Sequence, residues 1–138
     1  MRVAVVFFGS SRRDRVAELA RGVAEGIEKL GHQVDIIDGE KDSNATLTPY
    51  TYVALGTTST SFFGGRIPDS IATWLGRAGM IAGKKSFAFL LATPLGAQKS
   101  LARLMKTMEH EGLFIRFSDV LRSREEAALV GSRLKLES

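Results

Sequence analysis

The chain has 138 residues, 44% hydrophobic and 25% charged, which fits one globular domain with a full hydrophobic core. It contains no cysteine, and this excludes disulfides, thiolate catalysis and cysteine metal sites. The formal net charge is +4, but lysine and arginine are spread along the chain beside acidic residues, so basicity alone says little about partners. The first residues are too quickly interrupted for a signal peptide and no apolar run approaches ~20 residues, so we expect a cytoplasmic protein without a membrane span.

The amino-terminal stretch combines an apolar run, a polar and basic turn, and an amphipathic helix. Residues 3–8 are continuously apolar, as in a strand that a parallel sheet covers on both faces. Apolar side chains then recur every three or four positions over residues 16–30, which predicts a helix that ends at Gly31. Gly22 and Gly26 lie one turn apart in this helix and indicate close packing on the sheet, with two merely tolerated glycines as an equal alternative.

The rest of the chain alternates between strand and helix patterns. Further strands are predicted at residues 34–38, 52–56, 86–91 and 113–117. One helix starts at Pro68 and a second ends at Gly112, while Ser123 begins a capping-box pattern that opens a terminal helix. Residues 39–49 are a polar connection in which a helix is short or absent.

This alternation predicts an α/β fold with right-handed crossovers, formed by a single domain over residues 1–138. The expected architecture is a three-layer sandwich whose five-stranded parallel sheet has the order 2-1-3-4-5, with helices on both faces. In that order the carboxyl ends of the first, third and fourth strands are neighbours. The loops that follow these strands should therefore converge on one crevice, where ligands of such sheets bind.

Three loop motifs make the chain resemble the flavodoxin family over essentially its whole length. They are the turn Gly9-Ser10-Ser11, the loop that ends in Phe62-Phe63-Gly64-Gly65-Arg66-Ile67-Pro68, and the turn Thr93-Pro94-Leu95-Gly96. The aromatic-Gly-x-Ile-Pro sequence of the second loop is the most specific of the three. The resemblance implies a flavodoxin-like sandwich that binds flavin mononucleotide (FMN) non-covalently, with the first loop on the phosphate and the other two loops beside the isoalloxazine ring.

The resemblance and the loop chemistry together give a set of expected cofactor-binding residues. In chain order they are Gly9, Ser10, Ser11, Arg12, Arg13, Thr57, Thr58, Ser59, Thr60, Phe62, Phe63, Gly64, Thr93, Pro94, Leu95 and Gly96. We expect no catalytic side chain and no metal site, because neither His32 nor His110 has ligand partners at metal-binding spacing. Both histidines are expected at the surface.

The first loop departs from the family's Thr/Ser-x-Thr-Gly-x-Thr pattern, because basic residues replace its threonines and glycine. A phosphate on the helix amino terminus would receive bonds from backbone amides, from Ser10 and Ser11, and from Arg12 or Arg13. The alternative has no ligand at all. In it, Ser11 is the helix N-cap and forms a capping box with Asp14.

The large and charged side chains elsewhere also admit two interpretations. Phe62 or Phe63 would stack on the flavin, or one or both rings would pack at the sheet edge. Trp74 shares an apolar helical face and is expected in the core or at an interface. Asp35 and Asp38 are interpreted as solvated residues on one strand face.

The expected function is electron transfer between protein partners, since no nicotinamide fingerprint or acid/base pair is evident. One alternative is a small flavin reductase that uses NAD(P)H, and another is a scaffold that has lost FMN. A phosphorylation receiver is excluded because acidic residues are missing after the first and third strands. Nucleic-acid binding through the arginine turn is disfavoured because the other basic residues are not clustered. The sequence leaves the oligomeric state open.

Overall fold

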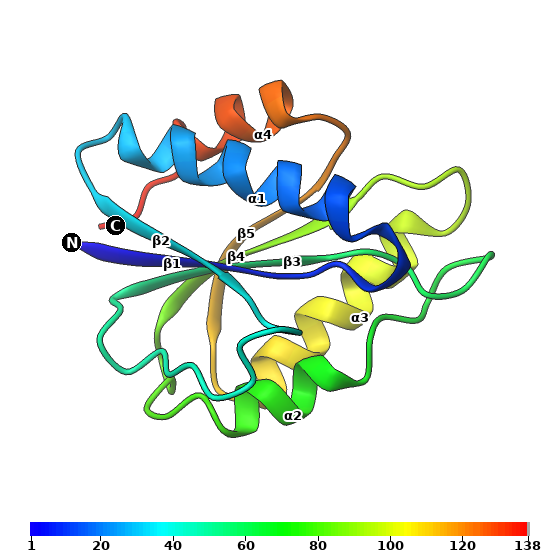
Figure 1. The fold of residues 1–138 in the computed structure, drawn as a ribbon, viewed down its shortest axis with the longest axis horizontal. Coiled ribbons are helices and arrows are strands. Elements are labelled where there is room, and N and C mark those ends of the chain that lie inside the picture. The colour runs from blue at the N-terminus through cyan, green and yellow to red at the C-terminus, as the bar shows by residue number, and fades with distance from the viewer. Residues whose placement is uncertain (138) are drawn as a thin grey trace.

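The computed structural model describes residues 1–137 and contains a parallel sheet between two layers of helices (Figure 1). The strands are β1 (Arg2–Phe8), β2 (Gln33–Asp38), β3 (Tyr52–Thr57), β4 (Lys85–Leu91) and β5 (Phe114–Leu121). They pair in the order β2-β1-β3-β4-β5, with all four pairings parallel. The predicted fold class and strand order are confirmed.

The helices are α1 (Arg13–Glu28), α2 (Ser70–Gly76), α3 (Ala97–His110) and α4 (Arg124–Gly131). In Figure 1, α1 and α4 cover one face of the sheet, and α2 and α3 cover the other. Residues 39–49 contain no helix, as predicted. No helix within residues 1–137 has the length and apolar character needed to cross a membrane.

The core has two halves, one on each side of the sheet. The central strands β1, β3 and β4 contribute to both halves because they are buried on both faces, which explains their unbroken apolar sequences. Trp74 belongs to the α2 side, where its ring packs edge-on against that of Phe8 with 5.7 Å between the ring centroids. Its indole Nε1–H donates to the Asp42 carbonyl at 2.9 Å, so the expected core position is confirmed.

The two glycines of α1 face α4, so the predicted packing on the sheet is wrong. A Cβ atom on Gly22 would lie 2.4 Å from the Arg124 carbonyl oxygen, and one on Gly26 would lie 2.3 Å from that of Ala128. The backbones of α1 and α4 therefore approach each other more closely than side chains would allow.

The two aspartates of β2 are also placed differently from the prediction. Three residues apart in a strand, Asp35 and Asp38 lie on opposite faces, and neither is simply solvated. Asp35 Oδ2 accepts bonds from the Tyr50 hydroxyl at 2.8 Å and from Arg2 at 3.3 Å. Asp38 pairs with an arginine of the first loop, as described below.

Candidate functional site

The loops that follow β1, β3 and β4 meet at the carboxyl edge of the sheet and enclose a cavity of about 370 Å³. We call it the three-loop cavity. Its lining consists of Ser11, Arg12, Ser59, Thr60, Ser61, Phe62, Thr93, Pro94 and Leu95. Its volume falls within the roughly 300–1,000 Å³ that is usual for small-molecule sites. The parallel order of the strands is what brings these distant residues together.

The other expected site residues are not part of this lining. They are Gly9, Ser10, Arg13, Thr57, Thr58, Phe63, Gly64 and Gly96. Thr57 and Thr58 are fully buried, and the Thr57 hydroxyl donates to the Phe8 carbonyl at 2.6 Å. The Thr58 hydroxyl accepts a bond from Arg12, which does line the cavity.

The first loop is a short 3-10 turn, Ser10–Arg12, that runs directly into α1. Ser10 has φ 52°, in the left-handed region, and the Arg12 N–H closes the turn on the Gly9 carbonyl at 2.9 Å. The N-cap position of α1 is Arg12, and no side chain caps the helix. The alternative in which Ser11 caps the helix is therefore wrong, and its hydroxyl stays exposed at the cavity.

The two arginines of this loop point to different partners. Arg12 lines the cavity and donates from Nη1 to the Thr58 hydroxyl at 3.2 Å. Arg13 donates from Nε to Asp38 Oδ2 at 2.8 Å, and its Nη2 lies 2.8 Å from the same oxygen. The Asp38 side chain is only 12% exposed, which corrects the expectation of a solvated residue.

A carboxylate from the turn after β2 also reaches the first loop. Glu40 Oε1 accepts the Ser10 N–H at 2.9 Å. The backbone N–H of Ser10, in the loop expected to bind the phosphate, is thus already bonded to a carboxylate of the chain. The long separation in sequence, thirty residues, hid this contact from the sequence analysis.

The second and third loops touch through two glycines. A Cβ atom on Gly64 would lie 2.2 Å from the Gly96 carbonyl oxygen, and one on Gly96 would lie 1.9 Å from that of Phe63. Both glycines also have positive φ angles, 83° and 71°. The two loops pack backbone against backbone, which only glycine permits at these positions.

Ser100 of α3 is a supporting residue that the sequence analysis missed. Its buried hydroxyl oxygen accepts the Ser59 O–H at 2.7 Å and the Gly65 N–H at 2.9 Å. The Ser100 hydroxyl itself lies 3.4 Å from the Arg66 carbonyl, to which it donates. A serine on the apolar face of α3, four residues before the buried Leu104, was the available signal.

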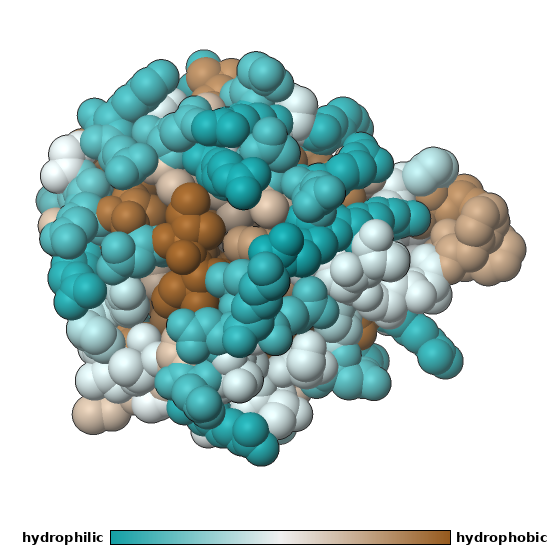
Figure 2. Space-filling view, in the orientation of Figure 1, coloured by the Kyte–Doolittle hydropathy of each residue, from teal (hydrophilic) through white to brown (hydrophobic). Residues whose placement is uncertain are grey.

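Phe62 and Phe63 form the tip of the second loop, which projects from the body of the molecule in Figure 1 and carries apolar surface in Figure 2. The side chains are 78% and 71% exposed, and the rings meet edge-on at 5.1 Å. The alternative in which both rings pack at the sheet edge is therefore wrong. Phe62 lines the three-loop cavity, and a ligand-facing ring stays a prediction.

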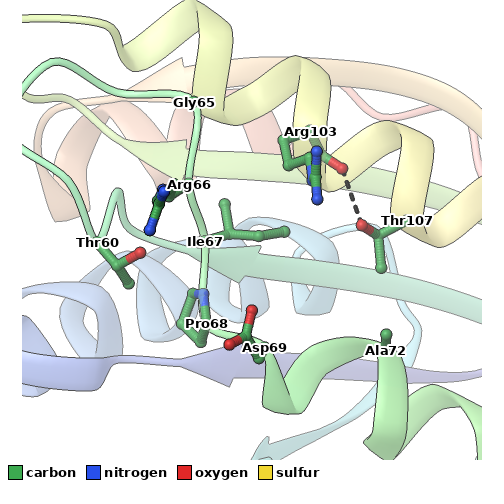
Figure 3. A pocket seen from close by; sticks show the side chains of 9 residues that line it. All are labelled: Thr60, Gly65, Arg66, Ile67, Pro68, Asp69, Ala72, Arg103 and Thr107. Atoms are coloured by element: carbon green, nitrogen blue, oxygen red, sulfur yellow. Dashed lines mark hydrogen bonds between the residues drawn. The ribbon is translucent and has the colours of Figure 1, made fainter.

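A larger cavity, about 600 Å³, lies on the other side of the second loop (Figure 3). Arg66 and Asp69 border it from the loop, and Arg103 borders it from α3, whose Thr107 hydroxyl donates to the Arg103 carbonyl at 3.0 Å. Neither the first nor the third loop contributes to its lining. Between the two cavities, the three-loop cavity is therefore the candidate for a cofactor.

No family model matches the chain, and no curated protein matches it in sequence. Solved structures do match. Oxidised flavodoxin 1 from Bacillus cereus has a TM-score of 0.74 at 17% identity, with 98% of this chain and 100% of that chain covered. A flavodoxin from the domain Archaea has a TM-score of 0.72 at 16% identity, with 96% and 94% covered. The flavodoxin of Streptococcus pneumoniae TIGR4 has a TM-score of 0.70 at 15% identity, with 96% and 97% covered. The fold is flavodoxin-like, as the three loop motifs implied.

The groups in the three-loop cavity match the two ends of a flavin nucleotide. The lining carries the guanidinium of Arg12 and hydroxyls from all three loops, those of Ser11, Ser59, Thr60, Ser61 and Thr93. Apolar surface from Phe62, Pro94 and Leu95 lies on the side of the other two loops. A planar ring with a phosphate tail could contact both kinds of group.

Proposed function

We propose that the chain binds FMN non-covalently in the three-loop cavity and acts in electron transfer. The observation that carries the proposal is the meeting of all three loops around one cavity whose lining combines a guanidinium and several hydroxyls with apolar side chains. Ser11 and Arg12 would hold the phosphate, and Phe62, Pro94 and Leu95 would flank the ring. When bound, the flavin supplies the electron-carrying chemistry. The residues of the chain bind it, orient it and shield part of it from water.

Contacts within the protein hold each part of the cavity wall in place before a ligand binds. Arg12 is held by Thr58, so its guanidinium is oriented before a ligand arrives and loses little freedom on binding. Ser100 and the glycine contact fix the second loop against α3 and the third loop. A preorganised wall of this kind favours binding because the loops lose their conformational entropy when the chain folds, and not when the ligand binds.

Titration with FMN tests the proposal directly. Binding should quench or shift the flavin fluorescence and raise the melting temperature, by an amount equivalent to about 2.7 kcal/mol at a hundredfold excess over Kd. If a saturating titration alters neither the fluorescence nor the melting temperature, the proposal is wrong.

A flavin-free scaffold is the second candidate, and the contact of Glu40 with the Ser10 amide favours it because that amide is already satisfied. The same titration separates the two candidates. If FMN binds, mixing the loaded protein with NADH or NADPH distinguishes the flavin reductase, in which the flavin bleaches rapidly, from an electron carrier. Protein redox partners and a cytoplasmic location stay predictions from the sequence.

A further inference from the structure

Asp38, the last residue of β2, bonds both to the turn that follows β2 and to the first residue of α1. Its Oδ1 accepts the backbone N–H groups of Glu40 at 3.0 Å and Lys41 at 3.3 Å, while its Oδ2 accepts the Arg13 guanidinium. The backbone adds a bond from the Gly39 N–H to the Phe7 carbonyl at 2.9 Å. Glu40 is thereby fixed relative to the end of β1.

From this fixed turn the Glu40 side chain reaches Ser10. Its Oε1 accepts the Ser10 N–H at 2.9 Å. Ser10 is the one non-glycine residue with positive φ within residues 1–137, so its amide is held in an unusual direction. A carboxylate of the chain therefore occupies one backbone donor of the first loop, the loop to which the proposed function assigns the phosphate.

The charges around the first loop are balanced as well. Four basic and four acidic side chains belong to the loop, the start of α1, the end of β2 and the turn over residues 39–42: Arg12, Arg13, Arg15, Lys41, Asp14, Asp38, Glu40 and Asp42. A phosphate that arrives there meets a region of no net formal charge. Removing one carboxylate would change that balance in favour of an anion.

We propose that Glu40 is a specificity-determining residue of the flavin site, a carboxylate that competes with the flavin phosphate for the first loop. The proposal rests on FMN binding in the three-loop cavity. FMN must displace Glu40 from Ser10 or share the loop with it, whereas riboflavin, which has no phosphate, leaves the contact intact. The wild-type protein consequently favours FMN over riboflavin by less than it would without Glu40.

Substitution of Glu40 tests this by comparing two ligands that differ only in the phosphate. In Glu40→Gln and Glu40→Ala, FMN affinity should rise about tenfold, equivalent to about 1.4 kcal/mol, and riboflavin affinity should stay the same. Glu28→Gln is the matched control, because it makes the same change in net charge at the far end of α1, roughly 20 Å away. If the ratio of the two affinities is the same in wild type and both Glu40 variants, the proposal is overturned.

A second measurement needs no flavin and keeps this proposal separate from the proposed function. Inorganic phosphate is titrated while the amide resonances of Ser10 and Ser11 are followed by NMR. Glu40→Ala should respond at lower phosphate concentrations than wild type, and an identical response in the two proteins would refute the competition. If Glu40→Ala gains phosphate binding but neither protein binds a flavin, the role of Glu40 stands and the FMN proposal falls.

Discussion

Arg13 and Asp38 form an ion pair in which Nε and Nη2 of the arginine lie 2.8 Å from one carboxylate oxygen. The pair distinguishes Arg13 from Arg12, although the two arginines are adjacent in the sequence and either was expected to bind the phosphate. Arg12 lines the three-loop cavity, whereas Arg13 is paired with Asp38 of β2. The two side chains should therefore affect different properties of the protein.

We expect Arg12→Ala to lower FMN affinity at least about tenfold, because it removes a charge-assisted bond to the phosphate. Arg13→Ala should lower FMN affinity less, and should cost about 0.2–1 kcal/mol in unfolding free energy because a partly exposed ion pair is lost. Fluorescence titration at one ionic strength and urea unfolding measure the two effects. Equal losses of affinity in both variants would contradict the separate roles.

Gly64→Ala should disrupt the wall of the cavity, because its Cβ atom would lie 2.2 Å from the Gly96 carbonyl oxygen. Gly65→Ala is the matched control. Its φ of 88° imposes a similar backbone strain, but a Cβ atom there meets nothing within 4 Å. We expect both variants to lose about 1 kcal/mol of stability from strain, and Gly64→Ala alone to lose flavin affinity. Similar flavin affinities in the two variants would show that the contact between the loops is dispensable.

Ser100→Ala should loosen the second loop, since it leaves the Gly65 N–H and the Ser59 hydroxyl without their acceptor. The expected cost is about 1–3 kcal/mol in unfolding free energy, the usual penalty for unsatisfied buried groups. Amide hydrogen exchange should accelerate at Gly65. Ser132→Ala, which removes a hydroxyl bond to the Leu129 carbonyl on α4, should leave that exchange rate unchanged.

The sequence predicts the elements well where apolar residues decide them. The strands β1, β3 and β4 are buried on both faces, so their apolar sequences mark them and the order of elements follows. The edge strand β5 was predicted to end at Phe117 but extends to Leu121. Its later residues include the polar Ser118 and Asp119, which an edge strand tolerates because one side is not covered.

The candidate site was predictable as a meeting of three loops but not in its individual bonds. Strand order alone places the loops together, because parallel strands bring their carboxyl ends to one edge. The partners of Arg13 and Ser10 lie 25 and 30 residues away, and depend on the register of β2 beside β1. No local pattern encodes such contacts.

Acid should weaken the contact between α1 and α4 through Glu18. Hydrogen bonding to Arg21 lowers the pKa of Glu18 below its ordinary value near 4.5; desolvation opposes this shift, and the nearby charge of Arg124 adds to it. Because the pKa is lower in the folded state, the ionised carboxylate stabilises the fold above about pH 4.5, and this contribution is lost as the pH falls through the folded-state pKa. Melting temperatures of wild type and Glu18→Gln should differ at pH 7, and the difference should shrink as the pH falls below 4.5. A difference that does not change with pH would contradict the assignment.

Gly26→Ala should destabilise the protein although alanine is the better helix former. The substitution gains up to about 1 kcal/mol of helix propensity, but its Cβ atom would lie 2.3 Å from the Ala128 carbonyl oxygen and 2.5 Å from the Ser132 nitrogen. Backbone atoms of α4 cannot move aside as a flexible side chain does, so α1 and α4 must separate, at a cost of about 1–3 kcal/mol.

Gly76→Ala at the end of α2 is the matched control, since its Cβ atom would meet only the end of the Glu111 side chain at 3.7 Å. We expect urea unfolding to show a loss of stability for Gly26→Ala and a small gain for Gly76→Ala, because only the first glycine lies between two helix backbones. A gain in both variants would mean that the close approach of α1 and α4 does not depend on glycine.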